Sequence, residues 1–86
     1  FPGLQLAWRA LAAAPGSTAV LNAANEIAVA AFLDRTIRFT DIHRINERTL
    51  EAVVPAQGDA ASIEALLALD ARARRHARTL VEGSAR

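Results

Sequence analysis

Apolar residues recur at helical spacing along most of the chain, and this pattern predicts an all-α fold, a small bundle of four to five helices. The first helix is expected from about residue 3 to residue 14, where Pro15 and Gly16 stop it. One helical stripe of this segment is apolar and consists of Leu4, Ala7, Trp8 and Leu11. The first helix should therefore pack through that stripe.

A second helix is expected over about residues 23–34, after a short connector, with Asn22 as its N-cap. Beyond its first turns this segment has no polar face. Its large apolar residues point in four different directions and are Ile27, Val29, Phe32 and Leu33. A helix that is apolar all round is typically wrapped by other helices. We therefore expect residues 23–34 to form the central helix of the bundle.

A third helix is expected from Asp41 to about Val54, with Thr40 as its cap and Pro55 at its end. Asp41 would lie in the first turn, where a negative charge complements the helix dipole. This helix would bury a stripe of Ile and Leu residues and expose its charged residues.

The last helical stretch begins after Ser62, its expected cap, and continues to about residue 82. Asp70 falls within its apolar stripe, one turn before Arg74. Asp70 could cap a separate fifth helix, or it could form an i,i+4 ion pair with Arg74 on one unbroken helix. A break at Asp70 is the preferred interpretation.

The length of 86 residues allows one small domain, and the formal net charge of +1 provides no general attraction to nucleic acid. No apolar run reaches the roughly 20 residues needed to cross a bilayer. We therefore expect neither a nucleic-acid partner nor a membrane partner. The chain starts at Phe1 rather than at methionine, so we expect it to be a piece of a longer protein.

Few side chains are arranged for chemistry. His43 and Glu47 lie four residues apart, but a third metal ligand is missing, and a solvent-facing ion pair is the better interpretation. A basic run occupies residues 72–78, and most of it lies opposite the apolar stripe, as expected of a solvated helix face. No known catalytic or nucleotide-binding motif is present. We predict no catalytic, cofactor-binding or metal-binding residue.

Asn22, Asn25 and Glu26 form a polar cluster at the start of an otherwise apolar segment. In one interpretation Asn22 caps the helix and Glu26 lies near its positive end. In the other, the cluster is an interdomain contact, because buried polar groups need partners. The second interpretation is slightly favoured, since the chain looks truncated.

Three segments resemble a known family: LNAANE at 21–26, AAFL at 30–33 and IRFTDI at 37–42. In this order and spacing they closely resemble the C-terminal helical domain of 1-deoxy-D-xylulose 5-phosphate reductoisomerase. The resemblance extends over essentially all of residues 1–86.

The resemblance implies a single supporting domain of a larger enzyme, an NADPH-dependent reductoisomerase of non-mevalonate isoprenoid biosynthesis. That family uses NADPH and Mg²⁺ or Mn²⁺, bound by nucleotide-binding and catalytic domains absent from this sequence. This fragment alone is therefore expected to be inactive and to bind no cofactor.

The resemblance further implies that its partner is the central catalytic domain of the same chain, in a homodimeric enzyme of the bacterial cytoplasm. The alternatives are a self-standing helical protein-interaction module without catalytic activity and a small arginine-rich binder of RNA or phosphate.

Overall fold

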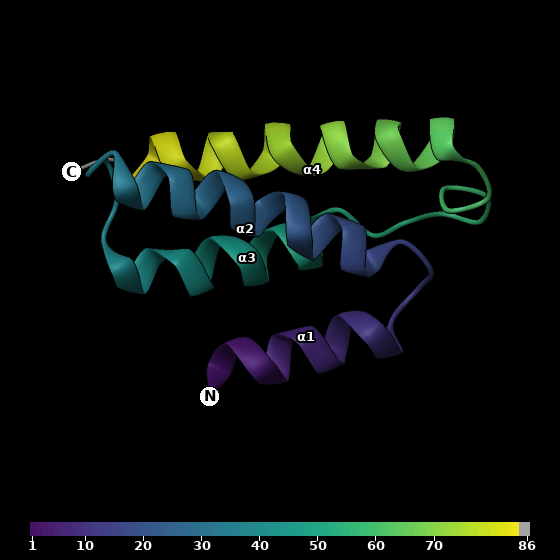
Figure 1. The fold of residues 1–86 in the computed structure, drawn as a ribbon, viewed down its shortest axis with the longest axis horizontal. Helices are drawn as coiled ribbons and strands as arrows, with labels where there is room; N and C mark the ends of the chain where they lie inside the picture. The colour runs from purple at the N-terminus through teal and green to yellow at the C-terminus, as the bar shows by residue number, and fades with distance from the viewer. Residues whose placement is uncertain (85–86) are drawn as a thin grey trace.

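A computed structural model describes residues 1–84, and these form four helices without a strand (Figure 1). The helices are α1 Pro2–Ala12, α2 Ser17–Leu33, α3 Phe39–Ala52 and α4 Ile63–Ser84. The all-α prediction is confirmed. The last two residues of the predicted domain, 85 and 86, lie outside the described residues.

The helices are stacked side by side (Figure 1). Helix α4 runs along one side of the molecule and α1 along the other, with α2 and α3 between them. The most extensive contacts join α2 to α4 and α2 to α3, whereas α1 rests on α2 and α3. Helix α2 is thus the central element, and α1 forms an outer layer.

Alanine, rather than the larger apolar residues, forms the buried face of α2. Ala23, Ala24 and Ala28 are completely buried, and Val20 joins them in the core. Leu33, by contrast, is exposed, so the expectation that α2 is wrapped on all sides is wrong. Ile45 of α3 and Leu69 of α4 are buried in the same core clusters as these alanines. The small side chains of α2 thus make room for larger ones from the neighbouring helices.

Helix α2 begins at Ser17, so Asn22 lies inside the helix and is not its N-cap, and the expected connector is helical. Gly16 precedes the helix with a φ of 99°, and its carbonyl accepts a hydrogen bond from the Val20 N–H at 3.1 Å. Ser17 and Val20 are buried, and their packing extends the helix beyond the boundary that its polar residues indicated.

Helix α3 also begins earlier than predicted, at Phe39, with Arg38 as the N-cap residue in place of Thr40. The reason is Asp41, whose Oδ2 accepts a hydrogen bond from the Arg38 N–H at 2.9 Å. A carboxylate at the third helical position can thus satisfy a backbone donor that precedes the first turn.

Helix α4 is continuous, so the preferred break at Asp70 is wrong and the ion-pair alternative holds. Arg74 Nε donates to Asp70 Oδ2 at 2.7 Å, one turn along the same helix. Leu69 and Ala73 are buried beside this pair and hold the middle of α4 against the core. The predicted role of Ser62 is confirmed, because its Oγ accepts a hydrogen bond from the Ala65 N–H at 3.0 Å.

Helix α1 packs through a different face from the one predicted. Its buried residues are Leu6 and Ala10, which join a core cluster with α2, α3 and α4. Leu4, Trp8 and Leu11, three members of the predicted stripe, are instead exposed. Both faces of α1 are apolar, so periodicity alone could not identify the one that contacts the rest of the molecule.

Candidate functional site

The polar cluster of α2 has partners within the chain. Asn22 Nδ2 donates to Glu26 Oε2 at 3.0 Å, and Arg74 Nη2 of α4 donates to Glu26 Oε1 at 3.0 Å. The hydrogen bonds that Arg74 donates to Asp70 and to Glu26 raise the pKa of its guanidinium above the ordinary value, and the bond to Asp70 has the larger effect. Asn22, Glu26, Asp70 and Arg74 therefore form a charged link between α2 and α4.

Asn25 faces a different neighbour. Its Oδ1 accepts a hydrogen bond at 3.0 Å from Nδ2 of Asn46, a residue of α3 that is only 8% exposed. The buried Asn46 Oδ1 has no partner among the described residues. Asn25 and Asn46 thus connect α2 to α3 beneath the N-terminal half of α1.

Two shallow pockets flank α1, and Asn25 and Asn46 line both of them. The first lies between α1 and α2, with Leu11 on one wall and Asn22 on the other. The second lies where α1 begins beside α3, and Phe39 is among its lining residues. Asn22 and Asn25, two of the three predicted contact residues, therefore adjoin the apolar surface of α1.

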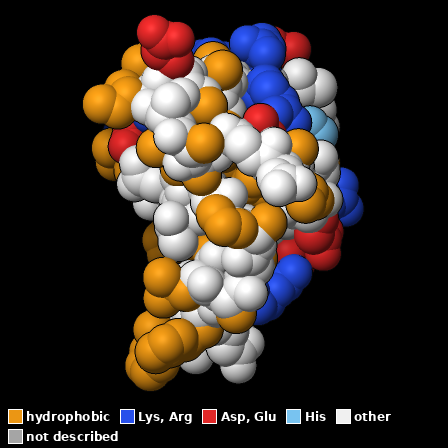
Figure 2. Space-filling view, turned by 90° about the vertical axis from the view of Figure 1, so that its right-hand side faces the viewer, with side chains coloured by type: hydrophobic (Ala, Val, Ile, Leu, Met, Phe, Trp, Pro, Cys, Tyr) orange, Lys and Arg blue, Asp and Glu red, His pale blue; other side chains and the backbone are white. Residues whose placement is uncertain are grey.

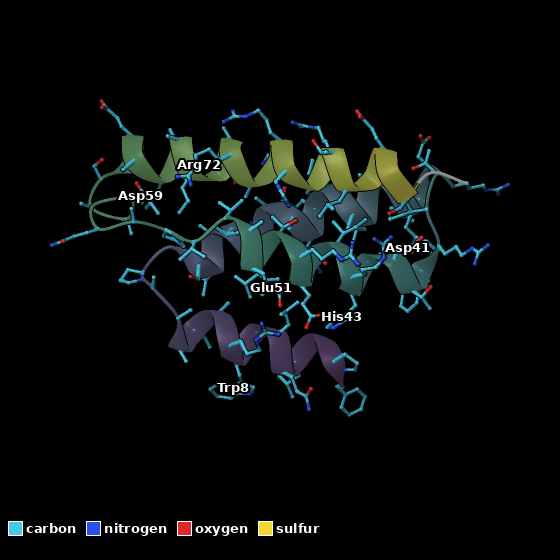
Figure 3. The ribbon with its side chains drawn as sticks, turned by 180° about the vertical axis from the view of Figure 1, so that it is seen from behind. Trp8, Asp41, His43, Glu51, Asp59 and Arg72 are labelled. Carbon is cyan, nitrogen blue, oxygen red and sulfur yellow. The ribbon has the colours of Figure 1, made fainter. Side chains whose placement is uncertain are left out.

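The side of α1 that faces away from α2 and α3 is apolar and exposed. Leu4 is 58% exposed, Trp8 64% and Leu11 65%. Trp8 points away from the other helices (Figure 3). Hydrophobic side chains also gather along one side of the narrow projecting part of the molecule at the bottom of Figure 2, where α1 lies. Together with Phe1, these side chains form what we call the outer face of α1.

Ion pairs hold the inner side of α1 to α3. Arg9 Nη1 lies 2.9 Å from Glu47 Oε2, and Arg9 Nη2 lies 3.8 Å from Glu51 Oε2. Glu51 and His43 lie on the side of α3 that faces α1 (Figure 3). Glu47 therefore pairs with an arginine of another helix rather than with His43. Residues 1–84 contain no group of three or more His, Cys, Asp or Glu side chains arranged to hold a metal ion.

The basic run of α4 is partly engaged in structural contacts. Arg72 Nη1 lies 3.3 Å from Asp59 Oδ2, in the loop before α4 (Figure 3). Arg74 joins α4 to α2, while Arg75 and Arg78 are exposed. In addition, none of the helices within residues 1–84 combines the length and apolar character that a membrane-spanning helix needs.

Comparison with known proteins identifies the family of this chain. Residues 1–76 match the family model described as the DXP reductoisomerase C-terminal domain. The chain belongs to this family.

Relatives of the DXP reductoisomerase C-terminal domain family are similar to the chain along almost its whole length. The 1-deoxy-D-xylulose 5-phosphate reductoisomerase of Cupriavidus metallidurans is 54% identical over 77 residues, which cover 90% of this chain and 19% of the relative. The Haemophilus influenzae protein of the same name is 48% identical over 81 residues, covering 94% and 20%. The chain thus spans about a fifth of the length of the curated relatives it matches. No solved structure was found to match it.

Reasoning from the sequence identified the polar cluster but missed the outer face of α1. A signal was available, because α1 contains two sets of apolar residues on different faces, Leu6 with Ala10 and Leu4 with Trp8 and Leu11. A short amphipathic helix needs one such face to pack on a small bundle. Helix α1 contains two such faces, and only one of them is buried in the bundle.

Proposed function

We propose that this chain is the supporting C-terminal domain of a 1-deoxy-D-xylulose 5-phosphate reductoisomerase. The parent enzyme would use NADPH to convert 1-deoxy-D-xylulose 5-phosphate to 2-C-methyl-D-erythritol 4-phosphate in non-mevalonate isoprenoid biosynthesis. One observation carries the proposal: the chain matches the family's C-terminal domain and about a fifth of the length of relatives that bear this enzyme's name.

The side-chain contacts of the bundle support a structural role. Two of its arginines form ion pairs that join helix to helix, because Arg9 joins α1 to α3 and Arg74 joins α4 to α2. Productive active-site geometry needs surrounding structure that holds its walls at a fixed separation. We propose that the bundle provides such support by packing on the central catalytic domain of the same chain.

We base the remaining proposals about the parent enzyme on the same family membership. NADPH and Mg²⁺ or Mn²⁺ would be bound by domains that precede residue 1, and the bundle itself would be inactive. We further propose that the parent is a homodimer of the bacterial cytoplasm.

Asn22, Asn25 and Glu26 are proposed as part of the contact with the catalytic domain. All three are exposed, and Asn22 and Asn25 line the pocket between α1 and α2. Asn22→Ala in the full-length parent tests this role, because Glu26 keeps Arg74 as its partner and the bundle should remain folded. Faster proteolytic release of the domain is expected, and an unchanged rate of release would contradict the contact.

The enzymatic part of the proposal is tested by expressing the whole reading frame that encodes residues 1–86. The purified parent should oxidise NADPH only when the deoxyxylulose phosphate substrate is present. Chelation of divalent cations should abolish that rate, and added Mg²⁺ or Mn²⁺ should restore it. A full-length protein that never consumes NADPH with this substrate would overturn the proposal.

A further inference from the structure

The outer face of α1 combines unusual exposure with an uncharged surface. Its members Phe1, Leu4, Trp8 and Leu11 are all more than half exposed, and Phe1 is 99% exposed. Arg9, the nearest charged residue of α1, is directed to Glu47 and Glu51 of α3. Contiguous exposed apolar side chains of this kind mark interaction sites on folded proteins.

Helix geometry makes this face one continuous stripe. Leu4, Trp8 and Leu11 follow the spacing i, i+4 and i+7, which aligns side chains on one side of a helix. Leu6 and Ala10 already anchor the opposite side to the core. The outer stripe is therefore available for contact while α1 stays attached to α2 and α3.

We propose that the outer face of α1 is covered by the part of the same polypeptide that precedes residue 1 in the parent subunit. This inference rests on the proposed function and adds to it the surface through which the bundle docks. The contact would be apolar, with Trp8 at its centre and the Asn22 and Asn25 amides at its edge.

The length of the relatives is the reason for proposing the preceding polypeptide as the partner of this face. The chain matches only about 20% of their length, and the family it belongs to is a C-terminal domain. In those relatives most of the polypeptide therefore comes before the matching segment. In a subunit built the same way, the preceding chain would reach the bundle at Phe1, one residue before α1 begins. A covalently attached domain is held at a high effective concentration beside that face.

A second exposed apolar group provides a matched control. Ile63 and Leu67 are exposed near the start of α4. That end of α4 lies far from the N-terminus of the chain (Figure 1). Leu67 and Leu11 are both leucines on helices, and each is 65% exposed. The same substitution therefore places the same charge at two equally exposed leucines, of which only Leu11 belongs to the outer face of α1.

The test compares Leu11→Asp with Leu67→Asp in the full-length parent, with limited proteolysis as the measurement. Proteolysis should release the C-terminal domain of the Leu11→Asp variant about tenfold faster than that of wild type. This factor corresponds to the loss of one buried leucine contact between the two domains. Leu67→Asp should release it at the wild-type rate. Equal rates for the two variants, or faster release by Leu67→Asp, would overturn the inference.

Hydroxyl-radical footprinting of the unmodified parent provides a measurement that needs no variant. Trp8 should be protected from oxidation, whereas the peptide containing Leu67 should react as an exposed segment. A freely oxidised Trp8 would contradict the proposed cover. So would protection that disappears when the parent dissociates to monomers, because the occupant would then be a second copy of the chain.

The NADPH assay on the same preparations separates this inference from the proposed function. If the wild-type parent is active and its two variants behave alike, the docking surface is wrong while the enzyme assignment stands. If the wild-type parent is inactive but Trp8 is protected, the enzyme assignment fails while the covered face stands.

Discussion

Gly16 determines how the chain turns from α1 into α2. Its φ of 99° lies in the left-handed region that residues with a Cβ rarely adopt. A Cβ at this position would lie 2.8 Å from Leu69 Cδ2 and 3.4 Å from Pro55 Cγ. Gly16 therefore combines a backbone requirement with a packing requirement.

We predict that Gly16→Ala lowers the free energy of unfolding by about 2 kcal/mol, from backbone strain together with the clash against Leu69. Urea denaturation of the two proteins measures the change. Gly58→Ala is the control, because Gly58 has a φ of 94° but no atom within 4 Å of the added Cβ. The control should cost about 1 kcal/mol. Equal losses for the two variants would mean that the close approach to Leu69 has no effect on stability.

Asp41 makes the stability of α3 depend on pH. The Arg38 N–H, followed by the Arg44 guanidinium, lowers the pKa of the Asp41 carboxyl below its ordinary value of 3.8. A lowered folded-state pKa means that the unfolded chain binds a proton more readily. The stabilisation is therefore present above the unfolded pKa and is lost as the pH falls through the folded pKa.

We predict that Asp41→Asn unfolds at a lower temperature than wild type at pH 7. The wild-type carboxyl is fully ionised there, because this pH is about three units above its ordinary pKa. The difference in melting temperature should shrink steadily once the pH falls below the ordinary value of 3.8. Thermal melts followed by circular dichroism across this range measure it. A difference that stays constant down to pH 2 would contradict the role assigned to the ionised carboxylate, since about two units below the unfolded pKa the carboxyl of the unfolded chain is protonated.

At the scale of the helices, Arg74 connects α4 to α2 through one guanidinium that is shared by Asp70 and Glu26. Its side chain is 26% exposed, whereas that of Glu26 is 54% exposed. Solvent screening therefore keeps the contribution of the interhelical pair small, and the shorter bond to the less exposed Asp70 contributes most.

We predict that Arg74→Ala lowers the free energy of unfolding by about 1–2 kcal/mol, because Asp70 loses its partner and Glu26 keeps only its hydrogen bond from Asn22. Chemical denaturation measures the loss. Arg78→Ala, at an exposed position of the same helix, should change it by less than about 0.5 kcal/mol. If both variants lose the same amount, Arg74 does not connect the helices in the way proposed.

The sequence predicted the helices better than it predicted their ends and contacts. Periodicity located all four, because local spacing of apolar residues carries that information. Asp70 was misread as a cap, since whether an aspartate caps or pairs depends on the packing of Leu69 and Ala73. Asn22 was misread for a related reason, because burial of Ser17 and Val20 starts α2 earlier than its polar residues indicated. Such tertiary contacts override local signals.

At the scale of the whole molecule, the family predicted from the sequence is confirmed, whereas the interdomain contact at the polar cluster stays a proposal. Asn22 and Asn25 do lie beside the pocket between α1 and α2. The apolar outer face was not predicted, because a helix with two apolar faces does not reveal which one meets the bundle. The sequence predicts that the first helix packs through Trp8 and Leu11, whereas both lie on the surface.

The central claim is that residues 1–86 support an enzyme without supplying groups to its chemistry. Its most direct test is the rate of NADPH oxidation by the parent after residues 1–86 are deleted, and again after the separate chain is added back. Loss of support should lower the rate by about 100-fold, as small displacements of active-site groups do, and adding the bundle should recover it. A deletion variant that keeps the full wild-type rate would contradict the claim.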